Sequence, residues 1–227
     1  MVREGSVEVE IDDRGTYTAT CAEGHRFVCH LGNPKFEILY EMALLAYSDG
    51  YTREAVATLA AASEEFYRFF VTLILAKRGF SEESKQDELK AFWKQVNRSE
   101  AQLGAFAAIH ILEKGSVPSF PDRQAVEFRN RVIHQGQIAN ASEVAVYGQK
   151  ILSFILPLYD EYRLSAPYLF ASGFARYSKV EQEEGVRVST HLYSTALRNL
   201  LALSGRPTFE RAVEFARTGG FLKSSAT

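Results

Sequence analysis

The sequence predicts a mainly α-helical protein: a helical bundle with a small N-terminal antiparallel β-meander and a C-terminal helical extension. Apolar residues alternate with polar ones near the N-terminus and then follow a helical period, while Gly, Pro and capping residues divide the helical part into segments. A chain of 227 residues can bury a substantial core. We therefore divide it into a meander at 1–34, a bundle at 35–163 and an extension at 164–227.

The meander is predicted from β-branched and aromatic residues that lie between Gly-containing turns. Val7, Val9 and Ile11 would share one face of the first strand, and Pro34 follows the last. Strands are expected at 7–11, 16–21 and 26–31, with turns at 12–15 and 22–24.

Two long helices are expected next. The first begins at Lys35 and ends where Asp49 and Gly50 break its apolar stripe. The second covers 51–78 and is apolar nearly all round in its second half, as is typical of a central buried helix. Gly79 is expected to cap it.

The middle of the bundle is predicted from caps and breakers. A polar helix follows Ser81 and either runs to Asn97 or pauses near Lys85. A further helix, 100–114, ends at Gly115. Residues 116–121, which include two prolines, form a rigid connector to a helix at 123–135. Asp122 is expected to cap that helix.

The last bundle helix is expected at 141–163. Asn140 and Glu143 have the spacing of a capping box, and Pro157 should kink or end the helix. In the extension, helices are expected at 190–203 and 208–217, and the sequence assigns this part no role.

Composition limits the function classes. Hydrophobic residues make up 46% and charged residues 24% of the chain, which is ordinary for a soluble globular protein. The formal net charge of −2 argues against a general electrostatic nucleic-acid binder, but it allows a local basic cleft. The N-terminus lacks a signal-peptide pattern, no stretch resembles a membrane span, and two cysteines suggest reduced thiols. We expect a cytoplasmic protein.

The most informative residues are Arg129, Asn130 and His134, at the end of the 123–135 helix and just before Gly136. Residues four apart share a helix face, so Asn130 and His134 lie on the same side. Arg129 starts about 140° from His134 around the helix axis, and its long side chain can close part of that gap. A cation, an amide and a proton carrier at one helix end can hold a phosphate and move a proton.

Arg129, Asn130 and His134, with three residues between the last two, resemble the signature of the HEPN superfamily of small all-helical domains. The helix order across about 35–163 is also similar to that family. The resemblance implies a metal-independent endoribonuclease that needs no cofactor. It also implies a homodimer in which two copies of the motif face each other across one cleft. Family members often carry an acidic residue in the long second helix. Glu64 matches that position best, and buried between helices it would orient Arg129, whereas Glu64 and Glu65 could also lie on a solvated stripe of the helix.

The chemistry of RNA cleavage suits these residue types. RNA supplies its own nucleophile, the ribose 2′-OH, so cleavage needs a base, an acid and a cation at the phosphate. An unperturbed imidazole, with a pKa near 6.5, can serve either proton role, which we assign to His134. Arg129 would bind the phosphate, Asn130 would orient the imidazole or donate to the phosphate, and Arg123 and Arg131 would contact RNA. Because one motif supplies one histidine, acid and base would come from different subunits.

Two other interpretations stay open at this point. Arg129 and Arg131 could simply pair with carboxylates such as Glu127, with His134 favourably placed at the negative end of the helix dipole. The domain could also be a non-catalytic HEPN-like dimer that binds RNA, a nucleotide or a partner protein. If the domain is an enzyme, the family resemblance would suit a toxin or phage-defence effector. Such an effector cuts RNA and is restrained by a neutralising protein partner.

A second group of residues has the types that bind zinc: Cys21, His25, Cys29 and His30. All four fall within ten residues, and the last two point to opposite strand faces, so four ligands on one ion are sterically awkward. We therefore expect a hairpin with two reduced thiols and no metal, and rank Cys21, His25 and Cys29 as weak zinc candidates. His110 is expected at the core or its edge.

Overall fold

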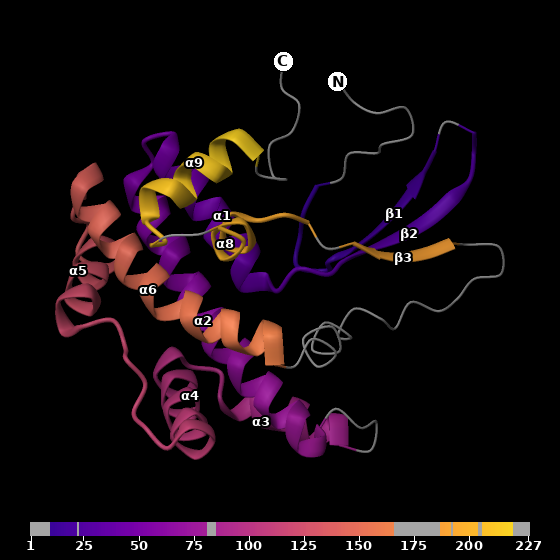
Figure 1. The fold of residues 1–227 in the computed structure, drawn as a ribbon, viewed down its shortest axis with the longest axis horizontal. Coiled ribbons are helices and arrows are strands. Elements are labelled where there is room, and N and C mark those ends of the chain that lie inside the picture. Colours follow the sequence, from indigo (N-terminus) through magenta and orange to yellow (C-terminus); the bar gives the residue numbers. More distant parts are fainter. Residues whose placement is uncertain are drawn as a thin grey trace.

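A long helix, α2 (Thr52–Leu75), lies at the centre of the fold and packs against α1, α4, α5 and α6. The computed structural model describes residues 10–21, 23–80, 85–165, 187–191, 193–203 and 206–219. Those residues form a helical bundle with a small sheet to one side, which confirms the predicted mainly α fold (Figure 1). None of the described helices combines the length and the apolar character that a membrane span requires.

The helix boundaries follow local signals closely. Gly50 ends the first helix with a φ of 85°, and Gly79, with a φ of 88°, lies in a π-helical turn at Ala76–Phe80. The polar helix begins at Gln86, and the cap expected at Ser81 lies outside the described residues. The other helices are α1 (Lys35–Ser48), α3 (Gln86–Gln95), α4 (Ser99–Lys114), α5 (Arg123–His134), α6 (Ala141–Ser165), α8 (Ala196–Leu201) and α9 (Phe209–Gly219).

Pro157 does not end its helix. Helix α6 continues through it to Ser165, close to the expected end at 163, so of the two effects expected of Pro157 the structure excludes an end of the helix. Proline removes the hydrogen bond to the carbonyl four residues earlier, at Ser153. Both Ser153 and Pro157 lie on the exposed side of α6, where water can satisfy that carbonyl.

The sheet combines both ends of the chain. Strands β1 (Thr16–Thr20) and β2 (Arg26–Leu31) pair antiparallel, as predicted. The third strand is β3 (Arg187–His191), which pairs parallel with β2. The strand expected at 7–11 is not seen in its described part, because residues 10 and 11 are not in a strand. The rest of it lies outside the described residues. The helix expected at 190–203 is therefore wrong at its start, because residues 190 and 191 belong to β3 and α8 begins at Ala196.

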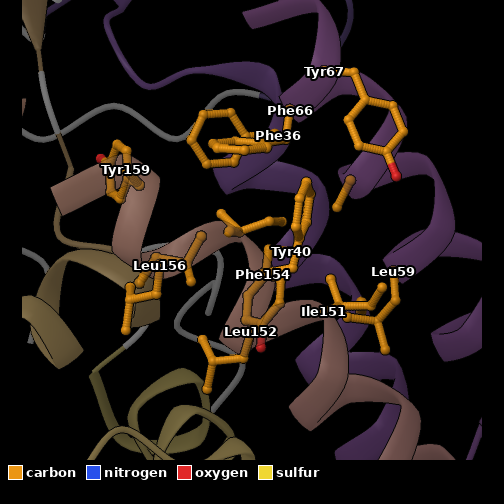
Figure 2. Close-up of a cluster of buried hydrophobic side chains, with 14 of the residues drawn as sticks. Phe36, Tyr40, Leu59, Phe66, Tyr67, Ile151, Leu152, Phe154, Leu156 and Tyr159 are labelled. Atoms are coloured by element: carbon orange, nitrogen blue, oxygen red, sulfur yellow. The ribbon is translucent and has the colours of Figure 1, made fainter. Parts of the chain in front are cut away.

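Aromatic side chains fill the core between α1, α2 and α6 (Figure 2). Phe36 on α1 meets Phe66 on α2 edge to face, with ring centroids 5.1 Å apart, and meets Tyr159 on α6 at 5.3 Å. Such pairs add about 0.5–1.5 kcal/mol each beyond the area that they bury. This packing fixes the rotation of α2 about its axis, which determines which residues face the neighbouring α5.

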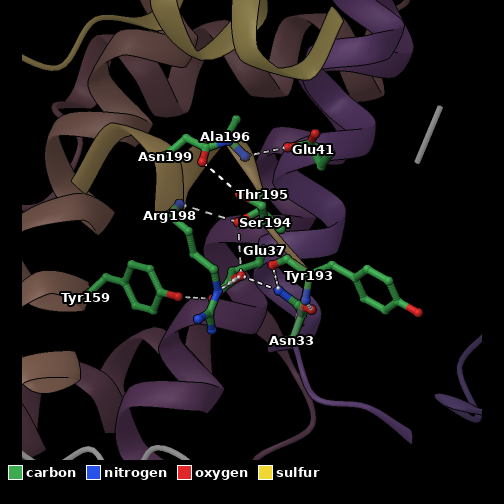
Figure 3. Close-up of polar contacts among 10 residues, drawn as sticks. All are labelled: Asn33, Glu37, Glu41, Tyr159, Tyr193, Ser194, Thr195, Ala196, Arg198 and Asn199. Atoms are coloured by element: carbon green, nitrogen blue, oxygen red, sulfur yellow. Dashed lines mark hydrogen bonds and ion pairs between the residues drawn. The ribbon is translucent and has the colours of Figure 1, made fainter. Parts of the chain in front are cut away.

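An ion pair with a buried carboxylate joins the C-terminal part of the chain to α1 (Figure 3). Glu37 is fully buried, and the guanidinium of Arg198 on α8 donates to both of its carboxylate oxygens, at 2.9 and 3.0 Å. Further donors satisfy the same carboxylate: Asn33 Nδ2 at 2.8 Å, Thr195 Oγ1 at 3.0 Å and the hydroxyl of Tyr159. Charge and hydrogen bonds therefore hold α8 to the bundle.

Helix α9 packs on α6 through a close contact at Gly148. A methyl group at this position would overlap the ring of Phe209, which is fully buried. We expect Gly148→Ala to lower the free energy of unfolding by about 1–3 kcal/mol, because the ring and α9 must move. Urea denaturation measures the change.

Gly104 on α4 provides the matched control, since a methyl group there meets no atom within 4 Å. Gly104→Ala should raise stability by about 0.5–1 kcal/mol, because alanine favours the helix. Equal effects of the two substitutions would contradict the packing of α9 on Gly148.

Candidate active site

Helix α5 carries the Arg129, Asn130 and His134 motif and is fixed at both ends by local contacts. At its N-terminus, the side chain of Asp122 accepts a hydrogen bond from the backbone N–H of Ala125 at 2.9 Å, as predicted. At its C-terminus, Gly136 has a φ of 72° and turns the chain away just after His134. The motif thus lies in the last turns of a capped helix.

All three motif residues line one cavity of about 380 Å³. The cavity lies among α2, the start of α4, the connector before α5, α5 itself and α6. Its lining residues are Ala60, Ser63, Glu64, Tyr67, Ser99, Glu100, Leu103, Phe120, Pro121, Ala125, Val126, Arg129, Asn130, His134, Tyr147 and Ile151.

Arg129 is held on the cavity wall by two acceptors. One terminal nitrogen donates to Glu64 Oε1 on α2 at 3.0 Å, and the other donates to Asn130 Oδ1 at 3.1 Å. The side chains of Arg129 and Glu64 are 27% and 35% exposed, so the pair borders solvent. The guanidinium is therefore oriented in advance and still reachable from the cavity.

Glu64 occupies the position that sequence reasoning assigned to an orienting acid. Burial raises the pKa of its carboxyl group, Arg129 opposes that rise, and Glu100 and Glu65 add to it. The cavity wall thus carries two carboxylates, Glu64 and Glu100, beside one guanidinium. The Glu64 charge compensates that of Arg129 within a single chain.

His134 is exposed at the edge of the cavity. Within the described part of the chain its imidazole makes no hydrogen bond and no ion pair. Asn130 lies one turn earlier on the same face of α5, as the spacing predicted. The imidazole is therefore accessible to a molecule that enters the cavity.

Two tyrosines add hydroxyl groups to the cavity, and the sequence did not single them out. Burial, together with the charge of Glu64, raises the pKa of Tyr67 to about 12. Burial also raises the pKa of Tyr147. Both hydroxyls stay protonated near neutral pH and can donate hydrogen bonds to a bound oxyanion. The spacing of Tyr67 from Glu64, three residues on one helix, was the signal that could have found it.

The two arginines expected to contact RNA do not line this cavity. Arg123 is exposed and pairs with Glu127 at 2.7 Å. The Nε of Arg131 donates to Gln137 Oε1 at 2.9 Å, and its side chain lines a different hollow, between α5 and α6. A contact of Arg123 or Arg131 with RNA would therefore lie outside the cavity.

The N-terminal Cys and His residues lie on the β1–β2 hairpin and do not contribute to this cavity. Cys21 and His25 lie side by side, with Sγ and Nδ1 3.5 Å apart. The sulfur of Cys29 contacts the backbone oxygen of His30. The ring Nδ1 of His30 forms a hydrogen bond with Thr16 Oγ1 at 2.9 Å. The structure thus separates Cys29 from the other two zinc candidates.

His110 is buried, as expected, and its Nδ1 lies 2.9 Å from the backbone oxygen of Ser116. It supports the end of α4 and does not line the cavity.

No family model, no curated protein and no solved structure matches this chain. The interpretation of the cavity therefore depends on its residues and their geometry.

Proposed function

We propose that the protein is a metal-independent endoribonuclease of HEPN type that acts as a homodimer. The observation that carries the proposal is the meeting of Arg129, Asn130 and His134 in one cavity, with Glu64 holding the guanidinium. Positioned groups of these types are what RNA cleavage by an internal nucleophile needs.

The proposed reaction is a transesterification within the RNA. A base takes the proton of the ribose 2′-OH, and the 2′ oxygen attacks the adjacent phosphorus. The bond from phosphorus to the 5′ oxygen breaks, and an acid gives a proton to that leaving oxygen. The products are a 2′,3′-cyclic phosphate and a 5′-hydroxyl. Arg129, with Tyr67 and Tyr147 as further donors, would stabilise the negative charge on the phosphate oxygens.

A second subunit supplies what one chain lacks. Of the residues that line the cavity, His134 alone carries an imidazole, whereas the reaction uses both an acid and a base. The Glu64 carboxylate also leaves little net positive charge beside Arg129. A symmetric partner that presents its own Arg129 and His134 at the same cleft would provide the second proton carrier and a second cation.

We expect the purified protein to cleave RNA in excess EDTA, and Arg129→Ala to lower the rate by about 10²–10³-fold. The physical reason is the loss of the oriented cation at the phosphate. Initial rates on total RNA and transfer RNA, read from gels, measure the effect.

Arg53→Ala is the matched control, because Arg53 is a half-exposed guanidinium at the start of α2 and does not line the cavity. Its rate should equal that of the unmodified protein. Cleavage that EDTA abolishes, or an equal loss in both variants, would refute the proposed mechanism.

The compensation of Arg129 by Glu64 favours a second candidate function, a non-catalytic HEPN-like module that binds a ligand in the same cavity. Two results together would support this candidate over the enzyme. The protein would cleave no RNA, and it would bind a ligand in the cavity with an affinity that Arg129→Ala lowers.

A further inference from the structure

The turn of the β1–β2 hairpin gathers three side chains that the proposed ribonuclease does not use. Cys21 and His25 close the turn, and the Cys21 N–H donates to the His25 carbonyl at 3.0 Å. Residues that face each other across an antiparallel pair project to the same side, so the thiol and the imidazole meet. Gly24, with a φ of 85°, allows the tight return of the chain. Glu23 lies within this turn.

Two of the three separations among these side chains match those of ligands on one zinc ion, and the third is at most 4.8 Å. Cys21 Sγ lies 3.5 Å from His25 Nδ1, and that nitrogen lies 3.5 Å from Glu23 Oε2. All three ligand atoms lie within 4.8 Å of one another. Tetrahedral zinc with ordinary bond lengths to sulfur, nitrogen and oxygen places neighbouring ligand atoms about 3.4–3.6 Å apart. Little movement is needed to bring the three atoms around a common centre.

We propose that the hairpin turn binds Zn²⁺ through the Cys21 thiolate, the Glu23 carboxylate and the His25 imidazole, with the fourth coordination position open. Sulfur and nitrogen donors select zinc and related transition metals over Mg²⁺ and Ca²⁺, which prefer oxygen. Binding displaces the proton of the Cys21 thiol into solvent. The hairpin extends away from the helices (Figure 1). The side chains of Glu23 and His25 are 81% and 76% exposed, so a ligand from solvent can reach the open position.

The other cysteine does not belong to this site. Burial raises the pKa of the Cys29 thiol, and a hydrogen bond with Tyr193 only partly opposes that rise. Its sulfur lies near the backbone oxygen of His30, in the middle of the sheet. Cys29 is therefore a matched control for Cys21: the same residue type in the same hairpin, with a different environment.

Cobalt titration tests the site, because a thiolate bound to Co²⁺ gives a charge-transfer absorption that free Co²⁺ lacks. Protein stripped with EDTA and then freed of chelator should bind one Co²⁺ per chain with this band, and added Zn²⁺ should displace it. Cys21→Ser should abolish the band, and Cys29→Ser should retain it. Glu23→Ala should weaken binding at least about tenfold.

The proposal is overturned if the unmodified protein shows no thiolate band, if Cys21→Ser retains it, or if Cys29→Ser loses it. Melting temperatures of the two serine variants check that the hairpin stays folded. RNA cleavage is assayed in EDTA, so the outcome for zinc binding and the outcome for the ribonuclease are independent.

Discussion

Replacing His134 with alanine is expected to lower the rate of RNA cleavage by about 10²–10⁴-fold, the usual contribution of a positioned acid or base. Its effect on folding should be small, within about 0.5 kcal/mol, because the side chain is exposed. The imidazole also makes no hydrogen bond with the described residues, so its removal leaves no partner unsatisfied. Initial rates and urea denaturation midpoints measure the two effects separately.

Gln135→Ala is the control for this substitution. Gln135 is the next residue, is also exposed and does not line the cavity. It should leave the cleavage rate unchanged. Full activity in His134→Ala would remove the imidazole from the mechanism and leave the cavity as a binding site only.

Mixed dimers test whether the site is shared between subunits. When the unmodified chain and His134→Ala are mixed equally and allowed to exchange, random pairing makes about a quarter of the dimers fully unmodified. A shared site that needs both imidazoles then keeps about a quarter of the activity, whereas subunits that act alone keep about half. Retention of half the activity would contradict the division of acid and base between two chains.

Local signals were enough to predict the helix that carries the motif. The Asp122 cap and the turn at Gly136 depend on residues close in sequence, and both are present in the structure. The common face of Asn130 and His134 follows from helical geometry alone. One side of the candidate site was therefore predictable from the sequence.

The opposite wall of the cavity depends on the contact between Arg129 and Glu64, 65 residues apart in sequence. Local patterns do not define this contact, and only the family resemblance pointed to Glu64. Glu64 and Glu65 are neighbours on α2 and differ in direction by about 100°. In the structure, Glu64 faces Arg129, while Glu65 pairs with Arg68 on its own helix at 3.3 Å. Aromatic packing of Phe66 against α1 and α6 sets that rotation, and only the folded core determines it.

The C-terminal part shows the same limit. Residues 187–191 form a strand because β2 has an edge with which they pair. Strand formation depends on such neighbouring strands more than on local sequence preference. The partner of Arg198 is equally distant, since Glu37 lies 161 residues earlier in the chain. Sequence patterns left this segment without a role, whereas the structure gives it a structural one.

Removal of the Arg198 guanidinium, whose side chain is only 21% exposed, should produce the largest loss of stability. Burial disfavours the charged form of Arg198 and so acts to lower its pKa. The hydrogen bonds and the charge of Glu37 outweigh this effect of burial and raise the pKa of the guanidinium. Arg198→Met keeps much of the side-chain length and leaves the Glu37 carboxylate buried without its counter-charge. We expect the free energy of unfolding to fall by about 3–5 kcal/mol in urea denaturation.

Two further variants separate the ion pair from simple loss of packing. Arg211→Met on α9 changes an exposed arginine and should cost less than about 0.5 kcal/mol. The double variant Glu37→Gln, Arg198→Met removes both charges, so its cost should be well below the sum of the single costs. Additive costs would mean that the two side chains act independently, in which case charge pairing would not be what attaches α8 to the bundle.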